Sequence, residues 1–369
     1  EYEKLTHVEH ILKRPDSYIG SVIPDVVDTW RLDAGRFERA QVTIAPGLLK
    51  IFDEILVNAI DQHTLHPKKV TRIDVTLDDT SITVRNNGDG IPIKMHDKEK
   101  VWLPELIFGH LLTSSNYDDT KERTTGGRNG YGAKLTNVFS SRFHVTVVSG
   151  GQKYTQTWSN NMANMTPATI KDFKGASGVE IQFVPDWRKF GASQFPNDFR
   201  TLIERRVWDA AAWCSKAHVY LNGTRIHVAS FEDYAKMHTG GVTVALGQDI
   251  VVAHSDTGKF EHVSYVNGIA TTHGGTHVDR FVSQLVAALP IKEIRPAQIK
   301  ASLFVFMKAT RDRPTPEVSR RINLPRRRAS TSRRPGSAAS SARGTMTPQA
   351  TMVTSLPARF TSATPSGTM

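Results

Sequence analysis

Residues 51–62 read IFDEILVNAIDQ, and this stretch decides how the chain begins to fold. Its apolar residues recur at three- and four-residue intervals, which predicts an amphipathic α-helix with one buried stripe. Glu54, Asn58 and Asp61 fall on the opposite flank, about one turn apart. Because the apolar stripe must be covered, the helix predicts a neighbouring sheet or a second helix.

The residues after this helix predict that sheet. Alternation at 73–77 and 82–84 predicts a β-hairpin, which runs into the turn-forming cluster NNGDGIP at 86–92. Further predicted elements are strands near 142–149, 152–158 and 178–184, a short helix opening at Ala133, a helix at 197–213, and a hairpin at 218–228 turning through Asn222 and Gly223. This order predicts an α+β sandwich, with helices on one face of a mostly antiparallel sheet.

A second unit begins near residue 230. Its predicted elements are strands near 249–254, 259–267 and 303–307, a glycine turn at 274–275, and a helix at 277–289. Beyond residue 311 the periodicity stops and Ser, Thr, Ala, Pro and Arg dominate, which is typical of a disordered segment.

The composition indicates a folded chain of two domains, with 39% apolar and 22% charged residues in 369. The single cysteine, Cys214, excludes a disulfide framework and a cysteine-based zinc site, and it fits a reducing compartment. No apolar run approaches the roughly 18 residues of a membrane span, and the first residues show no signal-peptide pattern. We therefore expect an intracellular protein with no membrane partner.

The formal net charge of +11 invites a nucleic-acid interpretation, but the charge is concentrated at one end. Residues 311–369 hold 11 Arg, no Lys and two acids, a net of +9, so residues 1–310 carry only +2. The run RRR at 326–328 is compatible with a localisation signal, a nucleic-acid-binding tail, or a solvated disordered tail. Basicity is therefore a weak indication of DNA binding here.

The run GGRNGYG at 126–132 places four glycines in seven residues ahead of a predicted helix. It fits neither the Walker A pattern nor G-x-G-x-x-G. Such a run exposes backbone N–H groups at the positive end of a helix, which suits a polyphosphate. A flexible surface loop is the alternative interpretation.

Glu54 and Asn58 project from one face of the predicted helix. A carboxylate there can orient and deprotonate a water molecule, and general-base help is typically worth about 10² to 10⁴ in rate. The Asn58 oxygen can hold a Mg²⁺ ion whose other ligands are phosphate and water oxygens. The alternative is a solvated polar face without chemistry.

Taken in order, Glu54 and Asn58, then Asn86, Gly88 and Gly90, then the glycine run resemble the nucleotide site of the GHKL (Bergerat) ATPases. Longer motifs narrow the match to the N-terminal ATPase region of eukaryotic type II DNA topoisomerases, and the resemblance runs through roughly residues 1–308. These motifs are EHIL at 9–12, RPDSYIG at 14–20, EILVNA at 54–59, LLTSSNY at 111–117 and TGGRNGYGAK at 125–134.

The resemblance implies a role for each matching residue. Glu54 would be the general base for water, and Asn58 the Mg²⁺ ligand. Asn86, where the superfamily usually has Asp, would contact the adenine amino group, with Gly88 and Gly90 allowing close approach of the base. The residues implied to contact the ribose or the phosphates are Ser114, Ser115, Asn116, Gly127, Arg128, Asn129, Gly130, Tyr131, Gly132, Ala133 and Lys134. Tyr2 stands where the family has an N-terminal strap that reaches the partner subunit's nucleotide.

The second unit resembles the transducer domain of the same family, through YVNGIA at 265–270 and GGTHVD at 274–279. There the family supplies a lysine to the γ-phosphate from a Gln-Thr-Lys loop. The spacing puts Ser319, Arg320 and Arg321 at that place in this chain. Arg321 keeps a positive charge, but a guanidinium fork is not a lysine point charge. The surrounding residues also lose the family pattern, so we interpret the tail as an altered C-terminus.

The expected architecture is a GHKL ATPase α/β sandwich at 1–228, a partial ribosomal-S5-like transducer domain at 229–310 and an atypical tail at 311–369. The resemblance implies a Mg²⁺-dependent ATPase that forms the N-terminal gate of a type II topoisomerase. ATP would drive homodimerisation and couple hydrolysis to passage of duplex DNA, with no DNA cleavage by this region alone. It also implies the nucleus, with an organelle as the alternative. The alternative function is a nucleotide-binding dimerisation module that does not hydrolyse ATP.

Overall fold

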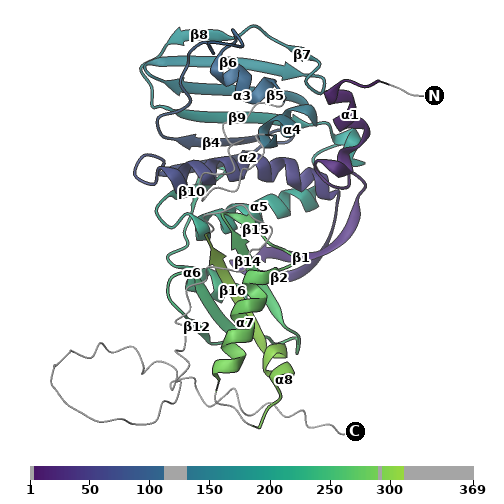
Figure 1. The fold of residues 1–369 in the computed structure, drawn as a ribbon, viewed down its shortest axis with the longest axis vertical. Coiled ribbons are helices and arrows are strands. Elements are labelled where there is room, and N and C mark those ends of the chain that lie inside the picture. The colour runs from purple at the N-terminus through teal and green to yellow at the C-terminus, as the bar shows by residue number, and fades with distance from the viewer. Residues whose placement is uncertain (1–3, 112–130, 290–292, 311–369) are drawn as a thin grey trace, which may run out of the picture.

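The computed structural model describes residues 4–111, 131–289 and 293–310. Within them, one large sheet with its helices forms the upper part of the molecule, and a smaller sheet forms the lower part (Figure 1). The predicted tail at 311–369 lies outside the described residues. No helix of the described part is long and apolar enough to cross a bilayer.

Helix α2, Pro46–Leu65, lies at the centre of the upper part (Figure 1). It confirms the helix predicted at 51–62 and extends it at both ends. Pro46 occupies the first turn, where its fixed φ favours a helix and its missing N–H is not needed. The helix contacts strand β4 on one side and helices α4 and α5 on others, so most of its surface is buried.

The nine-stranded sheet confirms the predicted mostly antiparallel arrangement. Its order is β11-β10-β3-β4-β9-β5-β6-β7, with β8 paired to β6. The strands are β3 (Arg72–Leu77), β4 (Ile82–Asn87), β5 (Ser140–Ser149), β6 (Gln152–Ser159), β7 (Asn164–Met165), β8 (Thr169–Asp172), β9 (Gly178–Pro185), β10 (His218–Leu221) and β11 (Thr224–Ile226). β10 pairs with β3 in parallel, and the other neighbours pair antiparallel.

Helices cover this sheet and shape the site described below. They are α1 (His7–Lys13), α3 (Leu103–Gly109), α4 (Gly132–Val138) and α5 (Asn197–Trp213). α1 begins at a capping box, in which Thr6 and Glu9 satisfy each other's backbone N–H groups. α5 has the bounds that the sequence predicts, because its apolar residues keep a regular helical period.

A two-stranded ribbon, β1 (Asp25–Asp33) and β2 (Arg36–Ile44), links the two parts of the molecule. The ribbon was not among the predicted elements. Trp30 stacks on Phe304 with ring centroids 5.7 Å apart, and Phe37 stacks on His238 at 4.1 Å. The two residues of each pair are more than 200 positions apart in the sequence, so local periodicity carries no signal for the contact.

The lower part is a five-stranded sheet in the order β12-β13-β16-β14-β15. Its elements are α6 (Phe231–Lys236), β12 (Thr243–Ala245), β13 (Ile250–His254), β14 (Glu261–Val266), β15 (Ile269–Ala270), α7 (Thr276–Ala288), α8 (Pro296–Ala301) and β16 (Leu303–Ala309). The strands and the helix predicted for the second unit are confirmed. A contact to the upper part comes from Lys308, whose Nζ donates to the Ala212 carbonyl at 3.2 Å near the end of α5.

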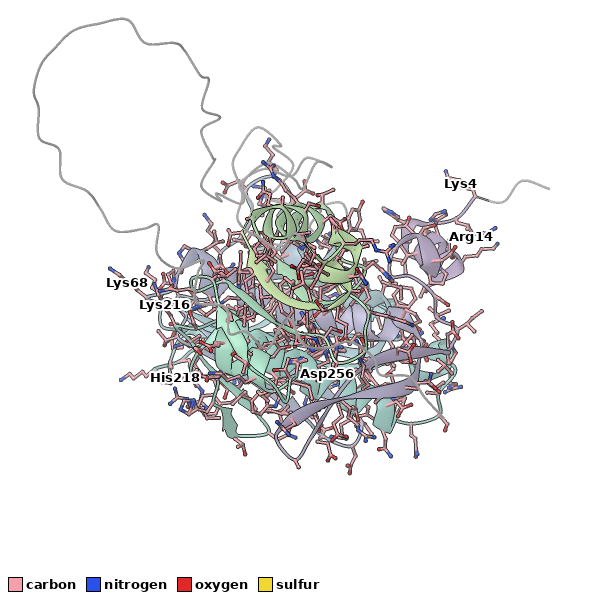
Figure 2. The ribbon with its side chains drawn as sticks, turned by 90° about the horizontal axis from the view of Figure 1, so that it is seen from below. Lys4, Arg14, Lys68, Lys216, His218 and Asp256 are labelled. Atoms are coloured by element: carbon pink, nitrogen blue, oxygen red, sulfur yellow. The ribbon has the colours of Figure 1, made fainter. Side chains whose placement is uncertain are left out.

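Exposed cations project from opposite sides of the molecule. Figure 2 shows Lys4 and Arg14 beside α1 on one side, and Lys68 and Lys216 on the other. Lys68 precedes β3 and Lys216 precedes β10, which are neighbours in the sheet. The positive charges labelled in this view are therefore spread over two sides.

The turn between β14 and β15 packs directly onto α2. Gly268 has a φ of +76°, and a Cβ atom there would lie 2.7 Å from Ile60 Cγ2. The turn between β10 and β11 has nearly the same backbone, because Asn222 and Gly223 have φ values of 49° and +78°. Nothing lies within 4 Å of a Cβ atom built at Gly223, so this turn is a matched but uncrowded counterpart.

We predict that Gly268→Ala destabilises the chain more than Gly223→Ala does. Both substitutions carry the backbone strain of a positive φ, but only the first adds overpacking against α2, which typically costs about 1–3 kcal/mol. Urea unfolding of the two variants and the wild type measures the difference. Equal losses of unfolding free energy would show that the turn does not press on α2.

Candidate functional site

The Glu54 carboxylate of α2 lies against the first residue of α4. A Cβ atom built at Gly132 would overlap Glu54 Oε2 and approach its Cδ to 3.0 Å. A side chain at position 132 therefore displaces the carboxylate, and glycine is needed for this close approach. The structure thus brings the predicted general base and the end of the predicted phosphate-binding run together.

A buried hydrogen bond holds α4 on α2. Thr136 Oγ1 donates to the Ile51 carbonyl at 2.7 Å, and Thr136 is fully buried. Asn137 Nδ2 donates to the Phe108 carbonyl at 3.1 Å, which ties α4 to α3 as well. Because both partners are buried, α4 has a defined position beside Glu54. The sequence reasoning did not identify Thr136, since its partner is a backbone carbonyl far along the chain.

Lys50 places a positive charge beside Glu54. The Lys50 Nζ to Glu54 Oε1 distance is 2.5 Å, and the Glu54 side chain is 21% exposed. The sequence reasoning missed Lys50, although its spacing of four residues from Glu54 on a helix is a recognisable signal. The carboxylate therefore sits in a partly shielded site with a cation at hand.

Lys134 on α4 is buried, with 3% of its surface exposed. Burial lowers the pKa of Lys134 from 10.5 to about 8, because an ammonium ion loses its hydration there. An anionic ligand beside this ammonium would offset that loss. Lys134, Ala133 and Gly132 all lie in the first turn of α4, so a phosphate at this helix end would meet both backbone N–H groups and a cation.

The polar flank of α2 is not a solvated face. Asn58 is half-buried and Asp61 is only 7% exposed, and α2 contacts both α4 and α5. A fully solvated face is therefore wrong for these two residues, while their roles in chemistry stay predictions. Asn58 lies one turn beyond Glu54 on the same helix, as predicted.

Asn86, Gly88 and Gly90 lie at the end of β4 and in the loop that follows. Asn86 is buried, and its Nδ2 donates to the Asn87 carbonyl at 2.9 Å, so the amide oxygen faces the other way. A Cβ atom at Gly88 would lie 2.7 Å from Val70 Cγ2, and one at Gly90 would overlap the Val148 carbonyl. Both glycines are thus required by the packing of the chain itself.

Val70 connects this loop to the C-terminal end of α2. His63 Nδ1 lies 2.7 Å from the Val70 carbonyl oxygen, and His63 is in the last turn of α2. The candidate residues therefore follow α2 in order, with Gly132 against Glu54 and the loop at Gly88 near the C-terminal end of the helix.

α1 borders the beginning of α4. The His7 ring meets the Tyr131 ring edge-on, with centroids 6.1 Å apart, and Tyr18 meets His7 at 6.5 Å. Tyr131 is half-buried by this contact. α1 therefore packs beside Tyr131 at the start of α4, which local sequence patterns did not indicate.

The remaining predicted site residues cannot be placed, because they lie outside the described residues. They are Tyr2, Ser114, Ser115, Asn116, Gly127, Arg128, Asn129 and Gly130, and their roles stay predictions. The same holds for Ser319, Arg320 and Arg321.

The described part of the site combines a carboxylate, a carboxamide, a buried ammonium group and a helix N-terminus. This donor set fits a polyphosphate, because the N–H groups that open α4 form the positive end of the helix and Lys134 adds a cation in the same first turn. It also fits water activation by Glu54, since that carboxylate is only partly exposed.

Two family models match the chain. Residues 43–168 match the histidine kinase-, DNA gyrase B- and HSP90-like ATPases, and residues 215–295 match DNA gyrase B. The chain is 44% identical to DNA topoisomerase 2 of Penicillium chrysogenum over 341 residues, which is 84% of this chain and 21% of that protein. It therefore spans about a fifth of the length of this relative.

Solved structures of topoisomerase II ATPase regions are also similar to this chain. The crystal structure of the ATPase region of Saccharomyces cerevisiae topoisomerase II superposes with a TM-score of 0.79 at 42% identity, over 84% of this chain and 85% of that one. The ATPase and transducer domains of DNA topoisomerase II from Balamuthia mandrillaris give a TM-score of 0.78 at 37% identity, over 84% and 85% of the two chains.

We predict that Lys134→Met changes how stability depends on pH. The folded state releases the Lys134 proton near pH 8 and the unfolded state near pH 10.5, so the wild type gains stability over this range. A methionine does not titrate, so the stability of the variant relative to the wild type should fall by roughly 2 kcal/mol between pH 7 and pH 9.5.

Urea unfolding at the two pH values measures this change in stability. Lys174→Met, which removes an exposed lysine, should follow the wild type at both. A stability difference between Lys134→Met and the wild type that stays constant with pH would contradict a lowered Lys134 pKa.

Proposed function

This chain belongs to the eukaryotic DNA topoisomerase II family, in its ATPase region, and on that premise we propose that it hydrolyses ATP with Mg²⁺. The observation that carries the proposal is the contact between Glu54 and Gly132, with the buried Lys134 two residues further on. A carboxylate, a helix N-terminus and a desolvated cation are what hydrolysis of a phosphoanhydride requires of a protein.

Glu54 is the general base in this proposal. It accepts a proton from water, while Lys50 at 2.5 Å keeps positive charge beside the carboxylate and Gly132 leaves room for it. Lys134 and the N–H groups that open α4 stabilise negative charge on the phosphates. The buried side of α2 limits the access of bulk water to the carboxylate.

Asn58 is the proposed protein ligand for Mg²⁺, which when bound neutralises charge on the phosphate oxygens. Its half-buried carboxamide lies one turn from Glu54, so the ligand and the base share one rigid helix. Asn86 orients the adenine through its amide oxygen, because its Nδ2 is already engaged by the Asn87 carbonyl.

The remaining proposals concern the whole protein, of which this chain matches a fraction. We propose that nucleotide binding joins two copies into a homodimeric gate, and that hydrolysis couples to passage of duplex DNA. We place this activity in the nucleus. The similarity to topoisomerase II over 84% of the chain supports these proposals. It also favours hydrolysis over the alternative of a nucleotide-binding module without turnover.

We predict that Glu54→Gln lowers kcat for Mg²⁺-ATP by about 10² to 10⁴, because the amide cannot take the proton from water. Nucleotide affinity should change little, since the side chain keeps its size. A phosphate-release assay and equilibrium titration with a fluorescent ATP analogue measure the two quantities.

Glu204→Gln is the matched control, because Glu204 is a half-buried carboxylate on α5. It should keep the wild-type kcat. Wild-type turnover in Glu54→Gln would exclude Glu54 as the base, and a wild-type chain that binds no nucleotide would contradict the proposed function altogether.

We also predict that a non-hydrolysable ATP analogue converts the chain from monomer to dimer. Sedimentation velocity with and without the analogue measures this change, and Glu54→Gln with ATP should dimerise as well. A dimer in a wild-type chain that shows no turnover would favour the non-hydrolysing module, whereas a monomer under all conditions would contradict the gate.

A further inference from the structure

A buried polar chain runs from α2 to the second unit, and it begins at the residue beside Glu54. Arg206 Nε donates to Asp53 Oδ1 at 2.8 Å, and Arg206 Nη1 donates to Asp209 Oδ2 at 3.1 Å. Tyr234 OH donates to the other oxygen of Asp209 at 2.6 Å and lies 2.9 Å from Tyr265 OH. We call these five side chains the Arg206 network.

The Arg206 network joins elements from both parts of the molecule. Asp53 is on α2, Arg206 and Asp209 are one turn apart on α5, Tyr234 is on α6 and Tyr265 is on β14. Arg206 Nη2 also donates to the Gly268 carbonyl at 3.4 Å, in the turn that presses on Ile60 of α2. One guanidinium therefore contacts α2, α5 and the second unit at once.

Four of these five groups are desolvated, and the fifth, Asp53, keeps 16% of its side chain exposed. Arg206 is 5% exposed, Asp209 1%, Tyr234 0% and Tyr265 2%. Burial alone would lower the pKa of Arg206, but Asp53 and Asp209 outweigh it and the pKa is raised. Burial likewise acts to raise the pKa of Asp209, and the neighbouring arginines, Arg205 and Arg206, outweigh it. The charges are thus held by their partners, and losing one partner weakens the rest.

A buried ion pair adds little net stability, because desolvation offsets most of the attraction. What it does supply is a defined geometry, since the planar guanidinium group donates to its partners in only a few orientations. The position of Asp53 is therefore set by Arg206, which in turn is held by Asp209 and the second unit. Glu54 is the next residue on the same rigid helix.

We propose that Arg206 is a positioning residue, which orients α2 and the Glu54 carboxylate according to the placement of the second unit. The inference rests on the proposed hydrolysis at Glu54. The inference assigns the coupling between α2 and the second unit to side chains within the described residues. Tyr234 carries the coupling from the second unit, because its hydroxyl donates to Asp209 and Asp209 holds the guanidinium.

The test uses Tyr234→Phe in the full chain, because it removes one hydroxyl and leaves the ring. Tyr154→Phe is the matched control. Tyr154 is also fully buried, and its hydroxyl donates to Gln156 within β6 of the large sheet. Arg206→Lys is the second variant, which keeps the charge and removes the fork. Circular dichroism and a thermal melt identify variants that fail to fold.

The first readout is hydrogen exchange without nucleotide. Tyr234→Phe and Arg206→Lys should raise the amide exchange rates of residues 51–60 at least about 3-fold, while those of β5 and β6 stay at the wild-type level. Tyr154→Phe should leave the exchange of α2 unchanged. Exchange in α2 that matches the wild type in Tyr234→Phe would overturn the inference, and it would do so whether or not the chain hydrolyses ATP.

The second readout is steady-state turnover. The loss of one charge-assisted hydrogen bond in the Arg206 network should lower kcat in Tyr234→Phe about 5- to 10-fold and change KM less than twofold. Asp53→Asn should lower kcat similarly, and the double variant should be no slower than the slower single variant, because both act through Arg206. In the control double variant, Asp53→Asn with Tyr154→Phe, kcat should fall only by the factor seen in Asp53→Asn alone.

Losses of kcat that multiply in the Asp53 and Tyr234 double variant would overturn coupling through Arg206. The proposed function fails separately, if the wild type shows no turnover or if Glu54→Gln turns over like the wild type. The exchange experiment then still decides whether Arg206 positions α2.

Discussion

Helix α2 is buried against neighbours on several sides, and this constraint governs the rest of the structure. Its apolar stripe packs on the large sheet, Thr136 bonds α4 to it at Ile51, and the turn at Gly268 presses on it at Ile60. Because these contacts share one helix, the large sheet, α4 and the second unit all fix the positions of the same few side chains. The candidate site is where those constraints meet.

A buried helix that carries charges needs partners for them, because an unpaired buried charge is costly. Lys50 accompanies Glu54, and Arg206 accompanies Asp53, so adjacent carboxylates on α2 face different partners. The first pair remains partly exposed and lies where chemistry is proposed. The second is enclosed between α2, α5 and the second unit, where it sets geometry. Neighbouring residues on one helix thus have separate tasks.

Sequence patterns predicted the elements whose periodicity is local. α5 has its predicted bounds and the hairpin of β3 and β4 is where alternation placed it. The ribbon of β1 and β2 was not predicted, although its strands pair locally through a turn at Ala34 and Gly35. Its packing on Phe304 and His238 joins residues more than 200 positions apart and leaves no local pattern. Arg206 was not among the predicted site residues, because its partner Asp53 lies 153 positions away in the sequence. Lys50 was the exception, as its spacing from Glu54 is visible in the sequence.

The sequence by itself determined which residue types are available for chemistry and on which helices and turns they stand. Glu54 and Asn58 share a face of one helix because four residues make about one turn, and that holds before any packing. Only the tertiary structure decided that Gly132 meets Glu54, that Lys134 is buried, and that Arg206 joins α2 to the second unit. Local periodicity follows from bond geometry along the chain, whereas contacts between distant residues follow from how whole elements pack.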